Sequence, residues 1–113
     1  MINTNSVYGK DSIKVDYTKG EKTVKIVTPD HEEGFGILLK NGGASSVVVT
    51  VKAGNSILSV GDLSFTIEAN SEYILNLKDT GRYKNVYGED AGRIVIEIPE
   101  ASASNISLFP FEL

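Results

Sequence analysis

Reactive side chains are sparse in this chain, and the segment PDHEEG holds the densest group of them. His31 is the single histidine among 113 residues, and it is flanked by Asp30, Glu32 and Glu33. Imidazole and carboxylate groups are ordinary metal ligands, but consecutive loop residues rarely converge on one ion without a distant partner. We therefore expect a solvated loop here, with no metal site and no bound cofactor.

The remaining acidic residues also lack the spacing that catalysis requires. A glycosidase needs two carboxyl groups facing each other across a cleft, one of them with a raised pKa. A calcium loop needs regularly spaced Asp and Asn residues, which the segment GED at 88–90 does not supply. The chain has no P-loop, no dinucleotide-binding fingerprint and no nucleophile elbow. We therefore predict that it has no catalytic residues and is not an enzyme.

One segment carries residue types that are common at protein interfaces. TGRYKNVYGEDAGR brings together Arg82, Tyr83, Lys84 and Tyr87, and tyrosine and arginine often anchor protein contacts. A tyrosine that closely follows a glycine can equally pack back over the open end of its own fold. The sequence leaves these two roles open for one of the two tyrosines, and we take all four residues as candidates for partner binding.

A second candidate surface follows from the alternation of residues on either side of the turn NGGA. If Ile37 and Val49 point into the core, Leu38 and Val48 point out of it. On two paired strands, Leu38 and Val48 would form a small apolar patch, which single exposed apolar residues would not. The alternative is that a loop or the C-terminal segment FPFEL covers the patch.

These side chains must be positioned by β-strands, because apolar and polar residues alternate along most of the chain. No segment shows a convincing helical period. The expected strands are SIKVDYT (12–18), TVKIV (23–27), FGILLKN (35–41), SVVVTVK (46–52), LSFTIEA (63–69), YILNLK (73–78), RIVIEIP (93–99) and NISLFPFEL (105–113). The residues of the first seven strands that we expect to face the core are Ile13, Val15, Tyr17, Val24, Ile26, Ile37, Leu39, Val47, Val49, Val51, Leu63, Phe65, Ile67, Tyr73, Leu75, Leu77, Ile94, Ile96 and Ile98.

The turns between these segments predict three hairpins. Segments 12–18 and 23–27 are joined by TKGEK, 35–41 and 46–52 by NGGA, and 63–69 and 73–78 by ANSE. Asn-Gly is a strong hairpin signal because both residues tolerate positive φ.

Three further expectations concern the remaining connections and the last strand. TPDHEEGFG is expected to cross between sheets. Ile57, Leu58 and Val60 are expected to cover one end of the core. Pro110 places the last strand at a sheet edge, since proline lacks the amide of a central position.

Size and composition limit the classes that remain. The length fits one domain with one core, and a net charge of −4 without a basic stripe argues against nucleic-acid binding. Cysteine is absent, which excludes disulfides. No signal peptide or membrane-spanning run is evident, so we expect synthesis in the cytoplasm and no membrane partner.

The sequence predicts a single domain over residues 1–113. Its expected fold is an antiparallel β-sandwich of about eight strands, immunoglobulin-like or jelly-roll-like, with a closed barrel as the alternative. Residues 1–30 are expected to add an N-terminal hairpin. The sequence leaves self-association open.

The order of strands and turns from Gly36 to Leu113 resembles small head-associated β-sandwich proteins of tailed bacteriophages and prophages. The resemblance is carried by GILLKNGGASSVVVTVKAG, then GDLSFTIEANSEYILNL, GRYKN and a closing ASNISLFPFEL. The turn at Glu68, Ala69 and Asn70 departs from that pattern, in which glycine is commoner. The segment before residue 30 has no counterpart.

This resemblance implies a structural role in a virion and no catalytic residues. The expected function is capsid decoration, in which the protein binds the major capsid protein or another virion protein on the outer surface of the head and stabilises it. The expected location is then the capsid surface, after synthesis in the host bacterium. Two alternatives remain: a carbohydrate-binding or adhesion module, and a subunit of a head-to-tail junction, tail or contractile injection device.

Overall fold

The structure is a computed structural model that describes residues 1–7, 9–29, 34–57, 59, 61–77 and 80–113. Over these residues the chain is all-β, with two short 3-10 helices, η2 (Thr80–Arg82) and η3 (Ala103–Asn105). The strands are β1 (Ile2–Asn3), β2 (Asn5–Ser6), β3 (Thr18–Lys19), β4 (Thr23–Val27), β5 (Phe35–Asn41), β6 (Val47–Val51), β7 (Leu63–Ile67), β8 (Ser71–Asn76), β9 (Arg93–Glu97) and β10 (Ile106–Glu112).

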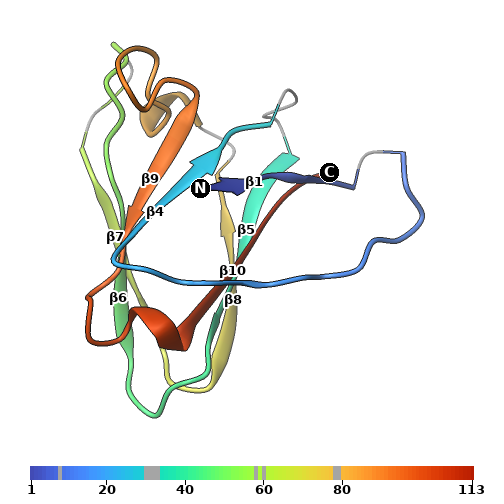
Figure 1. Cartoon of the computed structure of the whole chain (residues 1–113), viewed down its shortest axis with the longest axis vertical. Coiled ribbons are helices and arrows are strands. Elements are labelled where there is room, and N and C mark those ends of the chain that lie inside the picture. The colour runs from blue at the N-terminus through green and yellow to red at the C-terminus, as the bar shows by residue number, and fades with distance from the viewer. Residues whose placement is uncertain (8, 30–33, 58, 60, 78–79) are drawn as a thin grey trace.

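The described strands form two mixed sheets in a sandwich-like arrangement that is not closed into a barrel (Figure 1). The first sheet has the order β1-β4-β9-β6-β7. The second has the order β2-β10-β5-β8, and β3 also pairs with β10. Parallel pairing of β1 with β4 and of β2 with β10 makes both sheets mixed. The expectation of a purely antiparallel fold and the alternative of a closed barrel are therefore wrong.

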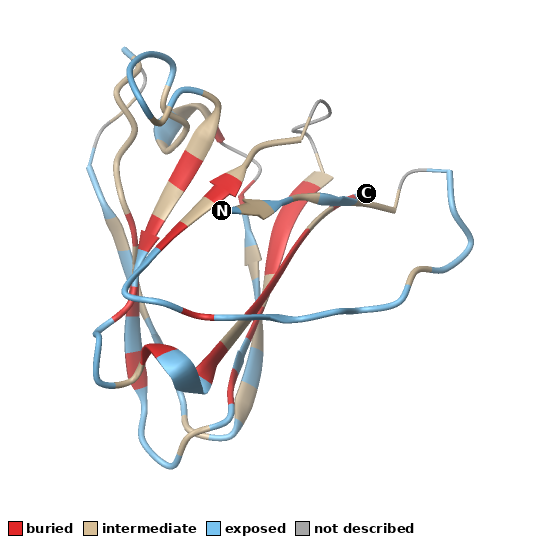
Figure 2. Cartoon of the chain, in the orientation of Figure 1, coloured by how far each residue is buried: buried red, intermediate tan, exposed pale blue. Residues whose placement is uncertain are grey.

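The core lies between the two sheets and is built by the alternation that the sequence shows. Along β4, β6 and β9, buried residues alternate with less buried ones (Figure 2). The predicted inward residues of β4, β5, β6 and β9 are buried, and those of β7 and β8 pack against them. The confirmed core positions are Val24, Ile26, Ile37, Leu39, Val47, Val49, Val51, Leu63, Phe65, Ile67, Tyr73, Leu75, Leu77, Ile94, Ile96 and Ile98.

The two edges of this pair of sheets differ in whether a further segment covers them. At one edge the N-terminal segment runs across both sheets, with β1 on β4 and β2 on β10 (Figure 1). Between these strands the Thr4 hydroxyl donates to the carbonyl of Val27 at 2.6 Å. We call this side, formed by β1 and β2, the closed edge. The other side ends in β7 in one sheet and β8 in the other, and we call it the open edge.

All three predicted hairpins are wrong, although most of the predicted strands are present. The segments at 35–41 and 46–52 contain β5 and β6, which belong to different sheets. The segment at 63–69 contains β7 and the segment at 73–78 overlaps β8, and these strands also belong to different sheets. The chain therefore changes sheet at both turns, and β6 pairs with β7 across the longer connection at 52–62.

Asn41 explains why the sequence NGG does not produce a hairpin. Its side chain is fully buried, and its amide donates to the carbonyls of Ser45 at 2.9 Å and Ile67 at 3.1 Å. Its Oδ1 accepts from the amide of Gly43 at 2.9 Å. Because Ile67 ends β7, the side chain ties β5 of one sheet to β7 of the other. Asn41 therefore connects the sheets rather than turning the chain back along one of them.

The N-terminal hairpin is wrong for a different reason. Residues 11–17 form no strand, and β4 pairs with β1 and β9 instead. Val15 and Tyr17, which were expected in the core, are 44% and 36% exposed. Tyr17 packs edge-on against Phe109 on the outer face of the second sheet, with ring centroids 6.4 Å apart. The alternation at 13–17 thus follows an outer surface rather than the core.

The last strand, β10, lies inside its sheet rather than at an edge. It pairs with β5 on one side and with β2 and β3 on the other. Its residues Ile106 and Glu112 accept hydrogen bonds on the second side from Gly20 and Val7. Pro110 points to that same side, between the two short strands, where its carbonyl accepts from the Asn5 side chain at 3.0 Å. Proline is tolerated there because neither short strand pairs with it.

Candidate functional site

The candidate site lies at one end of the sheets, where the connection after β6 meets the segment between β8 and β9. We call residues 52–57 and 80–92 the apical loop pair; it lies at the upper left of Figure 1. Backbone bonds join the two segments, since Gly54 donates to the carbonyl of Arg82 at 3.1 Å. A Cβ atom at Gly54 would collide with the backbone carbonyl of Lys84. Glycine is therefore required for this close approach of two backbones.

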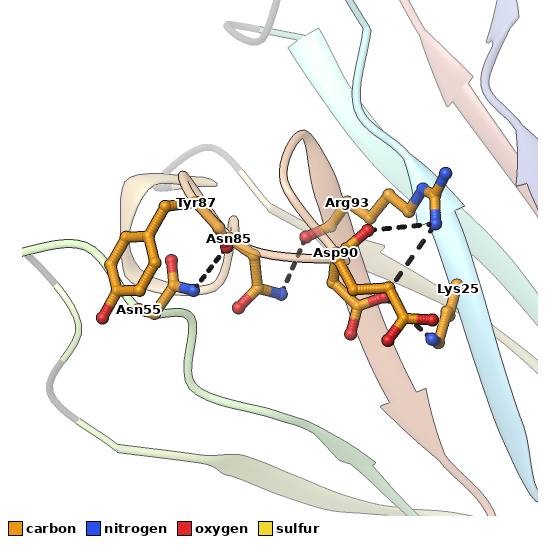
Figure 3. A network of polar contacts seen from close by, with 7 residues as sticks. Lys25, Asn55, Asn85, Tyr87, Asp90 and Arg93 are labelled. Carbon is orange, nitrogen blue, oxygen red and sulfur yellow. Dashed lines mark hydrogen bonds and ion pairs between the residues drawn. The ribbon is translucent and has the colours of Figure 1, made fainter.

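Asn55 holds the outer part of the apical loop pair in place (Figure 3). Its amide nitrogen donates to the carbonyl of Tyr87 at 2.9 Å. Its Oδ1 accepts from the amide of Val86 at 2.7 Å. The Ser56 hydroxyl adds a bond of 2.8 Å to the carbonyl of Gly81. These bonds fix the backbone under the exposed tip of the loop.

A charged group anchors the far side of the same loop to β4. Lys25 on β4 forms an ion pair of 2.8 Å with Asp90, as Figure 3 shows. The hydrogen bond to Asp90, followed by the charge of its carboxylate, raises the pKa of Lys25. Arg93 lies 4.0 Å from the same carboxylate. The loop is therefore held from two directions, by Asn55 and by Lys25.

A second ion pair closes the base of the connection between β6 and β7. Asp62 accepts from the backbone amide of Ala53 at 2.7 Å and from the Lys52 ammonium group at 2.8 Å. The backbone bond first, and then the Lys52 bond, lowers the pKa of Asp62. The bond to Asp62 raises the pKa of Lys52. Residues 52–53 are thereby tied to the start of β7.

The structure separates the four residues predicted in this loop. Tyr83 is partly buried and packs against the core, whereas Tyr87 is 65% exposed. Arg82 is exposed, and Lys84 is half-buried. Tyr83 therefore caps the end of the fold, and Tyr87 is the tyrosine available to a partner.

The predicted patch of Leu38 and Val48 does not exist as one surface. Leu38 lies on β5 in the second sheet, where it is half-buried opposite Ile74 and Phe109. Val48 lies on β6 in the first sheet and is 48% exposed. Because each points away from the core, they lie on opposite outer faces of the molecule. The prediction failed because it assumed that β5 and β6 pair.

Sequence reasoning missed the apolar residues that join Tyr87 at the tip. Ile57 is fully exposed and Val86 is 54% exposed. The expectation that Ile57 covers the core is wrong, while Leu58 and Val60 lie outside the described residues. The loop at 80–92 thus presents Val86 and Tyr87 beside a second segment that carries Ile57. No sequence signal could pair Asn55 with residues 86 and 87, because the contact spans more than thirty positions.

Metal sites and membrane-spanning helices can be assessed for the described residues. No group of three or more histidine and acidic side chains among them is placed to hold a metal ion. The segment around His31, for which we predicted a solvated loop, lies outside the described residues. None of the described helices is long and apolar enough to span a membrane.

Comparisons with known proteins identify no family for this chain. No family model, no curated protein and no solved structure matches it.

Proposed function

We propose that this chain is a non-enzymatic structural protein of a tailed bacteriophage or prophage. In this proposal it decorates the outer surface of the head by binding the major capsid protein or another virion protein. We also propose that the two sheets form a β-sandwich of the immunoglobulin-like or jelly-roll-like kind. The resemblance of residues 36–113 to head-associated phage proteins supports both proposals.

The observation that carries the binding proposal is the apical loop pair. Ile57, Val86 and Tyr87 are exposed, although the backbone beneath Val86 and Tyr87 is fixed by both polar atoms of Asn55. Preordered loops lose little conformational entropy when they bind, so more of the contact energy appears as affinity. An exposed tyrosine next to an exposed valine is the kind of side chain that anchors protein interfaces.

A decorating protein gains further from the symmetry of the shell. Each copy binds one of many equivalent sites, and contacts between neighbouring copies add to the total binding through effective concentration. A moderate contact at the apical loop pair is therefore sufficient for stable coverage. A fold built on two packed sheets suits this task because it holds the loops in one geometry.

Cosedimentation with capsids tests the proposal. The capsids are expanded heads of the phage or prophage whose genome carries this gene, and the protein is added at micromolar concentration. We expect saturable binding with a fixed number of copies per capsid. Absence of binding would contradict the proposal. Binding to isolated tails would instead place the protein there, and selective binding on a glycan array would make it a carbohydrate-binding module.

Variants at the tip make the test specific to the apical loop pair. Tyr87→Ala should weaken capsid binding by about tenfold or more, as expected for an interface tyrosine. Its melting temperature should stay at the wild-type value, because the side chain is exposed. Val48→Ser, on the outer face of the first sheet, is the matched control and should bind normally. Equal binding by Tyr87→Ala and wild type would remove the loop tip from the interface.

A further inference from the structure

Strand β8 at the open edge has backbone N–H and C=O groups that point away from its own sheet. Leu77 donates to the carbonyl of Phe35 at 3.0 Å, which makes residues 35 and 77 a hydrogen-bonded pair. Hydrogen-bonded and non-hydrogen-bonded pairs alternate along an antiparallel ladder. By the observed register, Leu38–Ile74 and Lys40–Glu72 are therefore non-hydrogen-bonded pairs. The N–H and C=O groups of Ile74 and Glu72 consequently point out of the sheet, on the side where β8 has no strand partner within the part of the chain that the structure describes.

Strand β8 also lacks most of the features that normally protect an edge. Edge strands in monomeric proteins are commonly very short, bulged, covered, or marked by proline or charged side chains, lysine above all. Strand β8 is six residues long and contains neither lysine nor proline, and Glu72 is its one charged residue. No residue from 71 to 76 has a positive φ. At its centre, Ile74 is 68% exposed.

We propose that the open edge is a dimer interface, in which β8 pairs antiparallel with β8 of a second copy about a two-fold axis at Ile74. The backbone groups of Ile74 in each copy then bond to those of Ile74 in the other. The two second sheets join into one continuous sheet, with both outer faces on the same side. Such an interface is isologous, so the same strand serves both copies. This inference does not depend on capsid binding.

The outward side chains of β8 suit this register because they complement themselves. Ile74 faces Ile74, and Glu72 of one copy faces Asn76 of the other, so a carboxylate meets a neutral amide. Lys40 lies 3.9 Å from Glu72 and reduces the local negative charge further. A slip that centred the pair on Glu72 would place two carboxylates opposite each other, which is destabilising. Charge therefore selects the register centred on Ile74 and favours a second copy of this strand as the partner.

Apolar surface next to Ile74 adds to the interface on the outer face of the second sheet. A groove of about 460 Å³ lies there, lined in part by Ile74, Gly36, Phe111 and Leu113. Leu113 is 68% exposed, and Phe111 is half-buried. Pairing of the two edges brings this face of each copy into one larger surface. Edge pairing alone buries little area, so we expect a dissociation constant on the order of tens of micromolar.

Introducing a positive or a negative charge at position 74 tests the pairing directly. Wild type should sediment as a monomer at low micromolar concentration and as a dimer at a few hundred micromolar. Ile74→Lys and Ile74→Glu should each remain monomeric, because like charges then face each other. An equimolar mixture of the two variants should dimerise again. The exposed position makes these variants safe for folding, which their melting temperatures will confirm.

A cross-linking experiment checks the register, since the chain contains no cysteine. In hydrogen-bonded antiparallel pairs the Cα atoms are about 5.5 Å apart, within the range that a disulfide spans. Ile74→Cys should therefore form a disulfide-linked dimer under mild oxidation much faster than the control Val48→Cys. Two results would overturn the proposal. One is wild-type protein that stays monomeric at a few hundred micromolar, and the other is equal cross-linking of the two cysteine variants.

Discussion

The closed edge and the open edge finish the same pair of sheets in opposite ways. At the closed edge, the N-terminal segment pairs with β4 and then with β10, and side chains such as Thr4 and Asn5 add bonds to both sheets. At the open edge, β7 ends one sheet and β8 ends the other, and no strand among the described residues pairs with their outer sides. The chain thus satisfies one edge with its own N-terminal segment and leaves the other available.

Side-chain burial follows the same division. Inward residues at the middle of the sheets, such as Ile26 and Val49, are fully buried. Inward residues of β7 and β8, such as Phe65 and Tyr73, are only half-buried. The open edge therefore exposes both backbone groups and part of the core. Strand β8 therefore keeps its ladder to β5, and in the dimer that we propose its outward side forms a second ladder.

The largest effect that we predict concerns the residue that fastens the open edge. Asn41→Leu removes three hydrogen bonds and leaves the buried carbonyl of Ile67 and the amide of Gly43 without their partner. Buried groups left unpaired cost about 1 to 3 kcal/mol each, so the free energy of unfolding should fall by about 3 kcal/mol or more. Urea denaturation measures it. Ser45→Ala is the control, because Asn41 binds only its backbone, and it should change stability little. A loss below 1 kcal/mol for Asn41→Leu would show that the Asn41 side chain is not what joins β5 to β7.

A matched pair of isoleucine truncations compares the two edges at intermediate effect. Ile2 at the closed edge packs against the core, whereas Ile74 at the open edge is 68% exposed. Ile2→Ala should cost about 1 to 2 kcal/mol, less than the 2 to 5 kcal/mol of a fully buried site. Ile74→Ala should leave the stability of the monomer unchanged when measured at low concentration. Equal losses at both positions would contradict the contrast between the edges.

The smallest effect concerns Asp62, which ties the start of β7 to residues 52 and 53. Its folded pKa lies below its unfolded value, so its contribution to stability is present above about pH 4, the ordinary range of aspartate. It is lost as the pH falls through the lower folded value. Asp62→Asn should therefore melt slightly below wild type at neutral pH, and the difference should shrink as the pH falls below the ordinary range of aspartate. A difference that grows on acidification would reverse the assigned sign.

Local alternation predicted seven strands that the structure contains, β4 to β10, but it missed β1 and β2 and could not predict which strands pair. Val24 and Ile26, or Ile94 and Ile96, alternate with polar residues because one face of each strand is buried, and this pattern is visible in any single strand. Pairing depends on distant residues. Asn41 looks like a hairpin turn locally, yet its buried side chain bonds to Ile67, 26 positions away. The same limit applies to Tyr17, whose contact with Phe109 makes an alternating segment part of an outer surface.

The candidate sites also combine features that the sequence shows locally with features that depend on the folded structure. Tyr83 and Tyr87 are both tyrosines and lie four positions apart in the sequence. Only the folded structure shows that Tyr83 packs against the core while Tyr87 is exposed. Ile74, by contrast, was accessible from the sequence. The predicted inward positions Tyr73 and Leu75 already required Ile74 to point outward. What the sequence lacked was the position of β8 at the end of its sheet.

Amide hydrogen exchange at increasing protein concentration tests the central claim most directly, that β8 keeps one ladder internally and offers another to a second copy. The amides of Tyr73 and Leu75 point toward β5 and should be protected at every concentration. The amide of Ile74 points out of the sheet, so it should exchange rapidly in dilute protein and become protected as the concentration rises. Rapid exchange of the Ile74 amide at all concentrations, with Tyr73 and Leu75 protected throughout, would contradict the account.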